Sequence, residues 1–200
     1  MSERSGPGDH VELPTAVVAA LARAEAAGFK LSSEPGVGAL LAALAASVRS
    51  RGHILELGTG AGVGLAWLVS GLGTRTDIEV ITVDINAELQ SATRAAGWPA
   101  YVRFDIGDGA VRAGQLGRFD LIFADAQGGK TVGLDQTIEA LSPGGILVVD
   151  DMDLALHDDP ELSEALTRVR AQLLGDRRLV SADLTYSSGV ILATRRRDAD

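Results

Sequence analysis

In residues 53–64, HILELGTGAGVG, a short apolar run leads directly into alternating glycines. Such a run predicts a buried strand, and the apolar stretch LAWLVSGL at 65–72 predicts a helix after it. A strand that turns through glycines into a helix is how a βαβ unit begins. Glycines in the turn let the backbone approach a ligand closely and adopt positive φ.

The same alternation of short apolar runs and helical segments continues on both sides of this stretch. Further strands are predicted at 79–84, 101–106, 119–125 and 145–151, and helices at 14–28, 32–50, 86–97, 131–141 and 160–175. Two final apolar runs, 178–186 and 189–197, predict an antiparallel hairpin. The pattern predicts an α/β fold: one doubly wound, mostly parallel sheet with a C-terminal antiparallel hairpin and two N-terminal helices. We expect residues 1–12 to be a flexible tail and residues 13–200 to form a single domain.

Composition excludes several classes of function. The chain has 200 residues, no cysteine and a formal net charge of −9. Disulfides, thiolate metal sites and cysteine nucleophiles are therefore excluded. A chain this acidic has no general attraction to nucleic acid or anionic lipid, so we expect neither as a partner. No apolar run reaches the roughly 18 residues of a membrane span. The polar start lacks a signal-peptide core, and we expect a cytoplasmic protein.

Carboxylates gather where the predicted strands end. In an open α/β sheet, ligands bind at the carboxyl ends of the strands, near the point where strand order reverses. The acidic residues at or just beyond these ends are Glu56, Asp84, Asp108, Asp125, Asp150 and Asp151. We therefore expect a ligand site at this edge of the sheet.

The sequence matches neither of the two common phosphate-binding motifs. The dinucleotide fingerprint G-x-G-x-x-G fails in every frame, and the segment ending Gly129-Lys130-Thr131 lacks the first glycine of a phosphate loop. The pattern present is E-x-G-x-G-x-G from Glu56 to Gly62, followed by Asp84 at the end of the next strand. Asp84 can accept hydrogen bonds from ribose hydroxyls. Glu56 would repel a pyrophosphate but suits a cationic ligand, and S-adenosylmethionine carries a sulfonium and an ammonium.

With these residues the chain resembles the class I S-adenosylmethionine-dependent methyltransferases, and within them the small O-methyltransferases related to catechol and caffeoyl-coenzyme A O-methyltransferases. The resemblance runs from about Pro35 to Arg197. The motifs that carry it are ILELGTGAGVGLAWL at 54–68, ITVDIN at 81–86, FDLIFADAQGGK at 119–130, LSPGGILVVDDM at 141–152 and SSGVILATRR at 187–196.

The resemblance also implies roles for individual residues. The methyl-donor site would comprise Glu56, Gly58, Gly60, Gly62, Gly64, Asp84, Gly107, Asp108, Gly109 and Asp125. A divalent cation, Mg²⁺ or else Ca²⁺ or Mn²⁺, would bind Asp125, Asp150 and Asp151, because hard cations prefer oxygen ligands. Lys130 and Asp125 would be catalytic. Two positions depart from the family: Asp151 replaces the usual asparagine, and Lys130 lies five residues after Asp125.

The expected function is methyl transfer from S-adenosylmethionine to a hydroxyl of a small molecule such as a phenol or catechol. Two alternatives stay open here: methylation of an amine, and a protein that binds the cofactor without turnover. The base could be Lys130 or His157, and the acceptor pocket could be formed by the N-terminal helices and residues 152–160. The resemblance also implies a homodimer.

Overall fold

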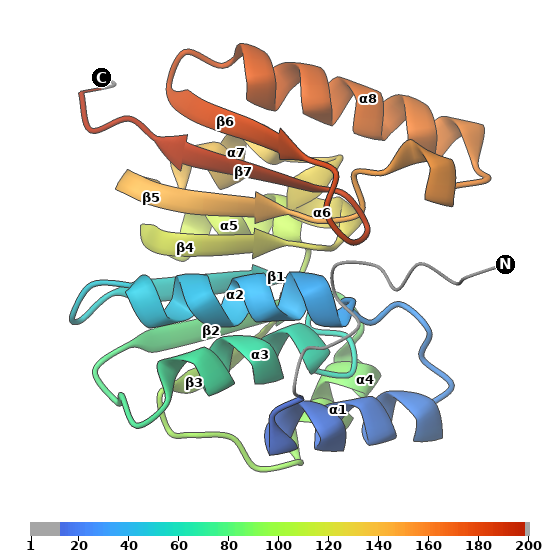
Figure 1. The fold of residues 1–200 in the computed structure, drawn as a ribbon. Helices are drawn as coiled ribbons and strands as arrows, with labels where there is room; N and C mark the ends of the chain where they lie inside the picture. Colours follow the sequence, from blue (N-terminus) through green and yellow to red (C-terminus); the bar gives the residue numbers. More distant parts are fainter. Residues whose placement is uncertain (1–12, 199–200) are drawn as a thin grey trace, which may run out of the picture.

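A computed structural model describes residues 13–198 and contains one seven-stranded sheet (Figure 1). The expected flexible tail at 1–12 lies outside the described residues. The strand order is β3-β2-β1-β4-β5-β7-β6, in which β1 to β5 are parallel and β7 is antiparallel to both of its neighbours. The strands are β1 (His53–Leu57), β2 (Glu79–Asp84), β3 (Val102–Ile106), β4 (Phe119–Ala124), β5 (Leu141–Val149), β6 (Leu179–Leu184) and β7 (Val190–Arg195).

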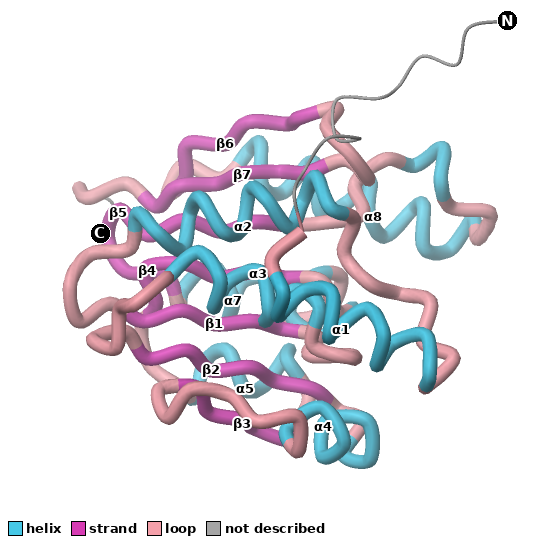
Figure 2. Tube along the Cα trace, turned by 60° about the horizontal axis from the view of Figure 1, so that its bottom comes forward, coloured by secondary structure: helices cyan, strands magenta, loops and turns pink. Residues whose placement is uncertain are grey.

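Helices cover both faces of the sheet (Figure 2). One face packs against α1 (Thr15–Ala26), α2 (Pro35–Ser47) and α3 (Val63–Leu72). The other face packs against α5 (Gly109–Gln115), α7 (Leu134–Glu139) and α8 (Pro160–Gly175). The remaining elements are α4 (Ala87–Arg94) beside β3, the short α6 (Gln127–Lys130) and a 3₁₀ turn, η1 (Leu154–Leu156). The predicted doubly wound fold with two N-terminal helices and a C-terminal hairpin is confirmed.

Three elements differ from the sequence prediction. The helix expected at 131–141 is shorter and forms only α7, because Gly133 just before it adopts a positive φ of 79°, while the short α6 at 127–130 precedes the predicted range. Strand β5 begins at Leu141 rather than at Gly145, and its register with β4 shifts near Phe119. Helix α5 was not expected from the sequence; it begins after Asp108, whose side chain accepts a hydrogen bond from the Ala110 amide.

The strand order reverses between β1 and β4, because the chain continues from β1 to β2 and β3 on one side and from β4 to β5 on the other. The carboxyl ends of β1 and β4 therefore lie together at this switch point, which is where open α/β sheets bind ligands. The glycine loop follows β1, and Asp125 follows β4. Within residues 13–198 we find no helix with the length and apolar character needed to cross a membrane.

Candidate active site

A cavity of about 650 Å³ opens at the carboxyl edge of the sheet. The glycine loop and Asp84 line one part of it, and the ends of β4 and β5 line another. Two further walls come from the α1–α2 connection at 29–34 and from the segment that includes Leu156 and His157. The predicted switch-point site is thus a real cavity that joins these four parts of the chain.

The glycine loop takes its shape from left-handed backbone positions. Gly58, Gly60 and Gly62 have φ values of 110°, 49° and 83°, which side-chain-bearing residues rarely adopt. Asp84 secures the loop, because its Oδ2 accepts a hydrogen bond from the Gly60 amide at 2.8 Å. Its Oδ1 accepts one from the Asn86 amide, also at 2.8 Å. The loop and the acid at the end of β2 therefore form one unit.

Glu56 lies beneath this loop and is completely buried. Its Oε2 accepts a hydrogen bond from the Thr82 hydroxyl at 2.5 Å, while Oε1 has no partner among the described residues. Burial raises the pKa of Glu56 well above its usual value, and the Thr82 hydrogen bond offsets part of that effect. The acidic side chains of Glu56, Asp84 and Asp125 gather around this loop, so a ligand with positive charges, such as S-adenosylmethionine, fits it better than a phosphate does.

The structure separates the residues of the predicted methyl-donor site into two groups. Those on the cavity wall are Gly58, Gly60, Gly64, Asp84 and Asp125. The others, Glu56, Gly62, Gly107, Asp108 and Gly109, do not line the cavity. Glu56 supports the loop from below, and Asp108 caps α5 at the surface.

The proposed metal ligands do come together. Asp125, Asp150 and Asp151 each offer a carboxylate oxygen, and these three oxygens lie within 4.8 Å of one another. Burial raises the pKa of Asp125, and the Asp150 carboxylate raises it further, while Lys130 opposes the shift. The pKa of Asp150 is also raised by burial, an effect that its hydrogen bond from Ser188 reduces.

Lys130 is buried beside this cluster. Its ammonium donates to the Asp150 carbonyl oxygen at 3.2 Å and lies 3.5 Å from Oδ2 of Asp151. When ionised, three carboxylates and one ammonium leave two net negative charges in a small, partly buried volume. Both this net negative charge and the set of oxygen ligands fit a hard divalent cation.

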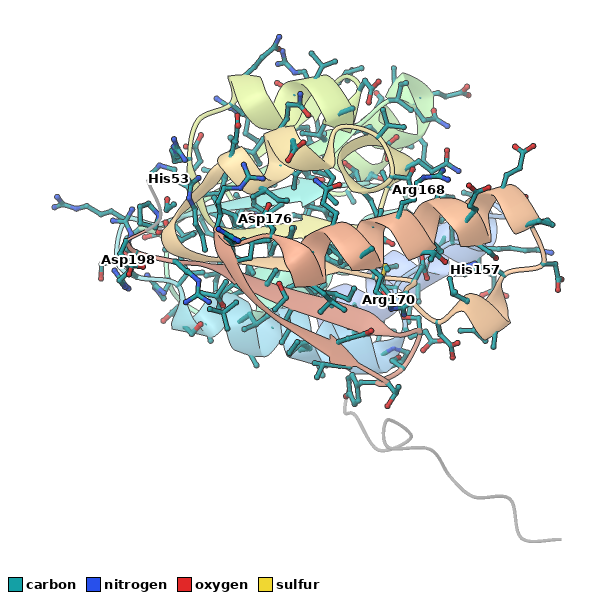
Figure 3. All side chains as sticks on the ribbon, turned by 90° about the horizontal axis from the view of Figure 1, so that it is seen from above. His53, His157, Arg168, Arg170, Asp176 and Asp198 are labelled. Carbon is teal, nitrogen blue, oxygen red and sulfur yellow. The ribbon has the colours of Figure 1, made fainter. Side chains whose placement is uncertain are left out.

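His157 lies on the cavity wall and is half-buried, and Figure 3 places it near the start of α8. Its Nε2 contacts the Asp151 carbonyl oxygen at 2.9 Å. The 29–34 wall falls in the connection after α1, close to the helices that were expected to build the acceptor pocket. Sequence reasoning missed the role of Ser188, which donates to Asp150 from the turn between β6 and β7. In the sequence, Ser188 is recognisable only as one of two adjacent serines at the turn of the predicted hairpin.

Comparison with known proteins agrees with this geometry. The family described as Methyltransferase domain matches residues 55–152. A Mycobacterium ulcerans (strain Agy99) protein named "Putative O-methyltransferase" is 34% identical over 179 residues, which cover 80% of this chain and 76% of that protein. A similar relative from Mycobacterium marinum (strain ATCC BAA-535 / M) is 33% identical over 177 residues, with the same coverage of both chains.

Solved structures show the same fold. Cofactor-bound Rv0187 from MTB has a TM-score of 0.82 at 24% identity, covering 98% of this chain and 100% of that one. The O-methyltransferase TomG from Streptomyces achromogenes, in complex with SAM, has a TM-score of 0.76 at 22% identity. The match covers 94% of this chain and 92% of that one. The fold and the switch-point cavity thus define a Rossmann-like methyltransferase. The chain belongs to the S-adenosylmethionine-dependent O-methyltransferase family.

Proposed function

We propose that this O-methyltransferase methylates a hydroxyl of a small phenol or catechol, with a divalent cation held by Asp125, Asp150 and Asp151. The observation that supports this proposal is that a single cavity joins the glycine loop and Asp84 to the three carboxylates. A methyl donor on the glycine loop and an acceptor beside the carboxylates would therefore share one cavity.

The reaction is an in-line displacement. The acceptor oxygen attacks the methyl carbon of S-adenosylmethionine, the carbon–sulfur bond breaks, and S-adenosylhomocysteine leaves as the hydroxyl proton passes to a base. Aligning the two reactants in one cavity can supply much of the rate. A bound divalent cation supplies Lewis acidity that lowers the pKa of the hydroxyl.

Lys130 is the residue of this chain that we propose to act on the acceptor oxygen. Its side chain reaches the cavity wall, where it contacts the Asp150 carbonyl and the Asp151 carboxylate. As an ammonium, Lys130 would stabilise the negative charge that the acceptor oxygen gains as it loses its proton. It can accept the acceptor's proton only after it has lost its own, and His157 on the same cavity wall is the alternative base.

The experiment is methyl transfer to a panel of phenols and catechols before and after treatment with EDTA. We expect turnover to be lost in the stripped enzyme and restored by Mg²⁺, while calorimetry shows S-adenosylmethionine binding largely intact. Full activity in the stripped enzyme would contradict the cation. Cofactor binding without transfer to any phenol or catechol would contradict the acceptor class.

The resemblance also leads us to propose a homodimer, which light scattering on the purified protein tests directly. The cytoplasmic location stays a prediction.

A further inference from the structure

The turn between β6 and β7 reaches back to the acid cluster from the far end of the chain. Ser188 in this turn is buried, with 4% of its surface exposed, and its hydroxyl donates a 2.5 Å hydrogen bond to Oδ1 of Asp150. The Asp151 amide donates to the same oxygen at 2.7 Å. Both hydrogen bonds to the Asp150 carboxylate in the described structure use Oδ1, so Oδ2 is left for another ligand.

The backbone holds Ser188 firmly against the segment after β5. The Ser188 carbonyl accepts a hydrogen bond from the Asp153 amide at 2.9 Å, and the Gly189 carbonyl accepts one from the Met152 amide at 2.9 Å. The contact is so close that a Cβ on Gly189 would lie 2.3 Å from the Asp153 nitrogen. The Ser188 hydroxyl is therefore placed by a rigid junction and not by a mobile turn.

The neighbouring serine has a different partner. Ser187 is exposed, and its hydroxyl donates to the Glu34 carboxylate just before α2. The chain thus offers two adjacent hydroxyls of the same chemistry, of which only Ser188 touches a proposed cation ligand. Ser187 is a matched control for any effect of Ser188.

We propose that Ser188 is a positioning residue that fixes the Asp150 carboxylate for cation binding, so that the C-terminal hairpin sets the affinity of the cation site. This inference rests on the cation of the proposed function. Hydrogen-bond partners that orient a metal ligand commonly change metal affinity by about 10- to 100-fold when they are removed. Without the hydroxyl, the Asp150 carboxylate keeps only the Asp151 amide and can rotate away from its ligand geometry.

The test is calorimetric titration of the full-length protein with Mn²⁺, with S-adenosylmethionine titrated in parallel. We expect Ser188→Ala to weaken Mn²⁺ binding by about 10- to 100-fold and to leave cofactor affinity unchanged. Ser188→Thr, which keeps the hydroxyl, should recover most of the lost affinity. Ser187→Ala should bind Mn²⁺ as the unaltered protein does. Ser188→Cys preserves the side-chain shape with a weaker donor, and it replaces Ser188→Ala if circular dichroism shows that the alanine variant is unfolded.

Each outcome decides one point. Equal Mn²⁺ affinity in Ser188→Ala and the unaltered protein overturns the positioning role and leaves the proposed function standing. Equal weakening by Ser187→Ala and Ser188→Ala also overturns it, because the hairpin would then act only through general stability. No Mn²⁺ binding by the unaltered protein overturns the cation together with this inference, while the cofactor titration still reports separately on the methyl-donor site.

Discussion

Asp151 shows how one residue changes the electrostatics of the site without changing its backbone. Asp151 has a φ of 59°, in the left-handed region where Asn and Asp are the side-chain-bearing residues most often found. The asparagine that the resemblance predicts at this position and the aspartate found here are therefore both compatible with this backbone conformation. The replacement adds a negative charge beside Asp125 and Asp150, and Lys130 balances only one of the three. The proposed cation would balance the negative charge that remains.

Asp84 lines the cavity beside the glycine loop. Its two oxygens already accept the Gly60 and Asn86 amides, which leaves further lone pairs for ribose hydroxyls. Asp84→Ala should therefore weaken S-adenosylmethionine binding, because a hydrogen bond to a charged group contributes about 1.5–3 kcal/mol, or about 10- to 100-fold in affinity. Calorimetry on the folded variant measures this. Glu88→Ala, which removes an exposed acid on α4, serves as the control, and unchanged affinity in Asp84→Ala would exclude Asp84 from the site.

The close packing of α2 against α3 depends on two glycines. A Cβ on Gly71 would lie 2.1 Å from the Ala42 carbonyl oxygen, and one on Gly38 would lie 2.0 Å from the Trp67 indole nitrogen. At Gly71 the obstacle is backbone, which cannot rotate away as a side chain can. These glycines let the N-terminal helices cover the face of the sheet beside the glycine loop.

Gly71→Ala should therefore destabilise the protein. Overpacking of this kind costs about 1–3 kcal/mol, and in a chain of this size each kcal/mol lowers the melting temperature by about 2–4 °C. Gly175→Ala at the end of α8 is the control, because a Cβ there meets no atom within 4 Å. That variant should melt at or slightly above the temperature of the unaltered protein, since alanine is the better helix former. Equal melting temperatures for Gly71→Ala and the unaltered protein would contradict the packing argument.

Among the elements, those with a strong hydrophobic period were predictable and those set by glycine geometry were not. Strands β1, β2 and β4 are short, mostly apolar and largely buried, so the sequence pattern was enough to predict them. Helix α5 has the sequence GAVRAGQ, which is too short and glycine-rich to show a helical period, and its signal was the capping Asp108. The break between α6 and α7 follows from backbone angles that no apolar pattern records.

The parallel topology of the sheet made several residues of the candidate site predictable. Parallel strands end at one edge of the sheet, so Asp84, Asp125 and Asp150 had to meet there once the fold was known. Ser188 could not be predicted in the same way, because its contact with Asp150 joins the C-terminal hairpin to the end of β5. Contacts between elements depend on the exact seating of turns, which periodicity does not describe.

The end of the molecule opposite His157 carries acidic as well as basic side chains, which bears on nucleic acid binding. Figure 3 shows Asp176 and Asp198 at the end of the molecule opposite His157. Arginines at the start of β6 and the end of β7 also lie there, but two of them are engaged within the protein. Arg178 pairs with Asp176 and Asp135, and Arg195 donates to backbone carbonyls. Arg196 and Arg197 are exposed but stand beside Asp198 in the sequence.

We therefore expect no appreciable binding of duplex DNA or RNA at physiological salt. Nucleic acid affinity depends on Lys and Arg side chains that are free to neutralise several phosphates, and the net charge of −9 opposes the approach of a polyanion. Fluorescence anisotropy with labelled duplexes at about 0.15 M salt measures this. Micromolar binding would contradict the prediction. Its loss in a variant that combines Arg196→Ala and Arg197→Ala would then locate the contact at this end, away from the cavity in which we propose the methyl-transfer site.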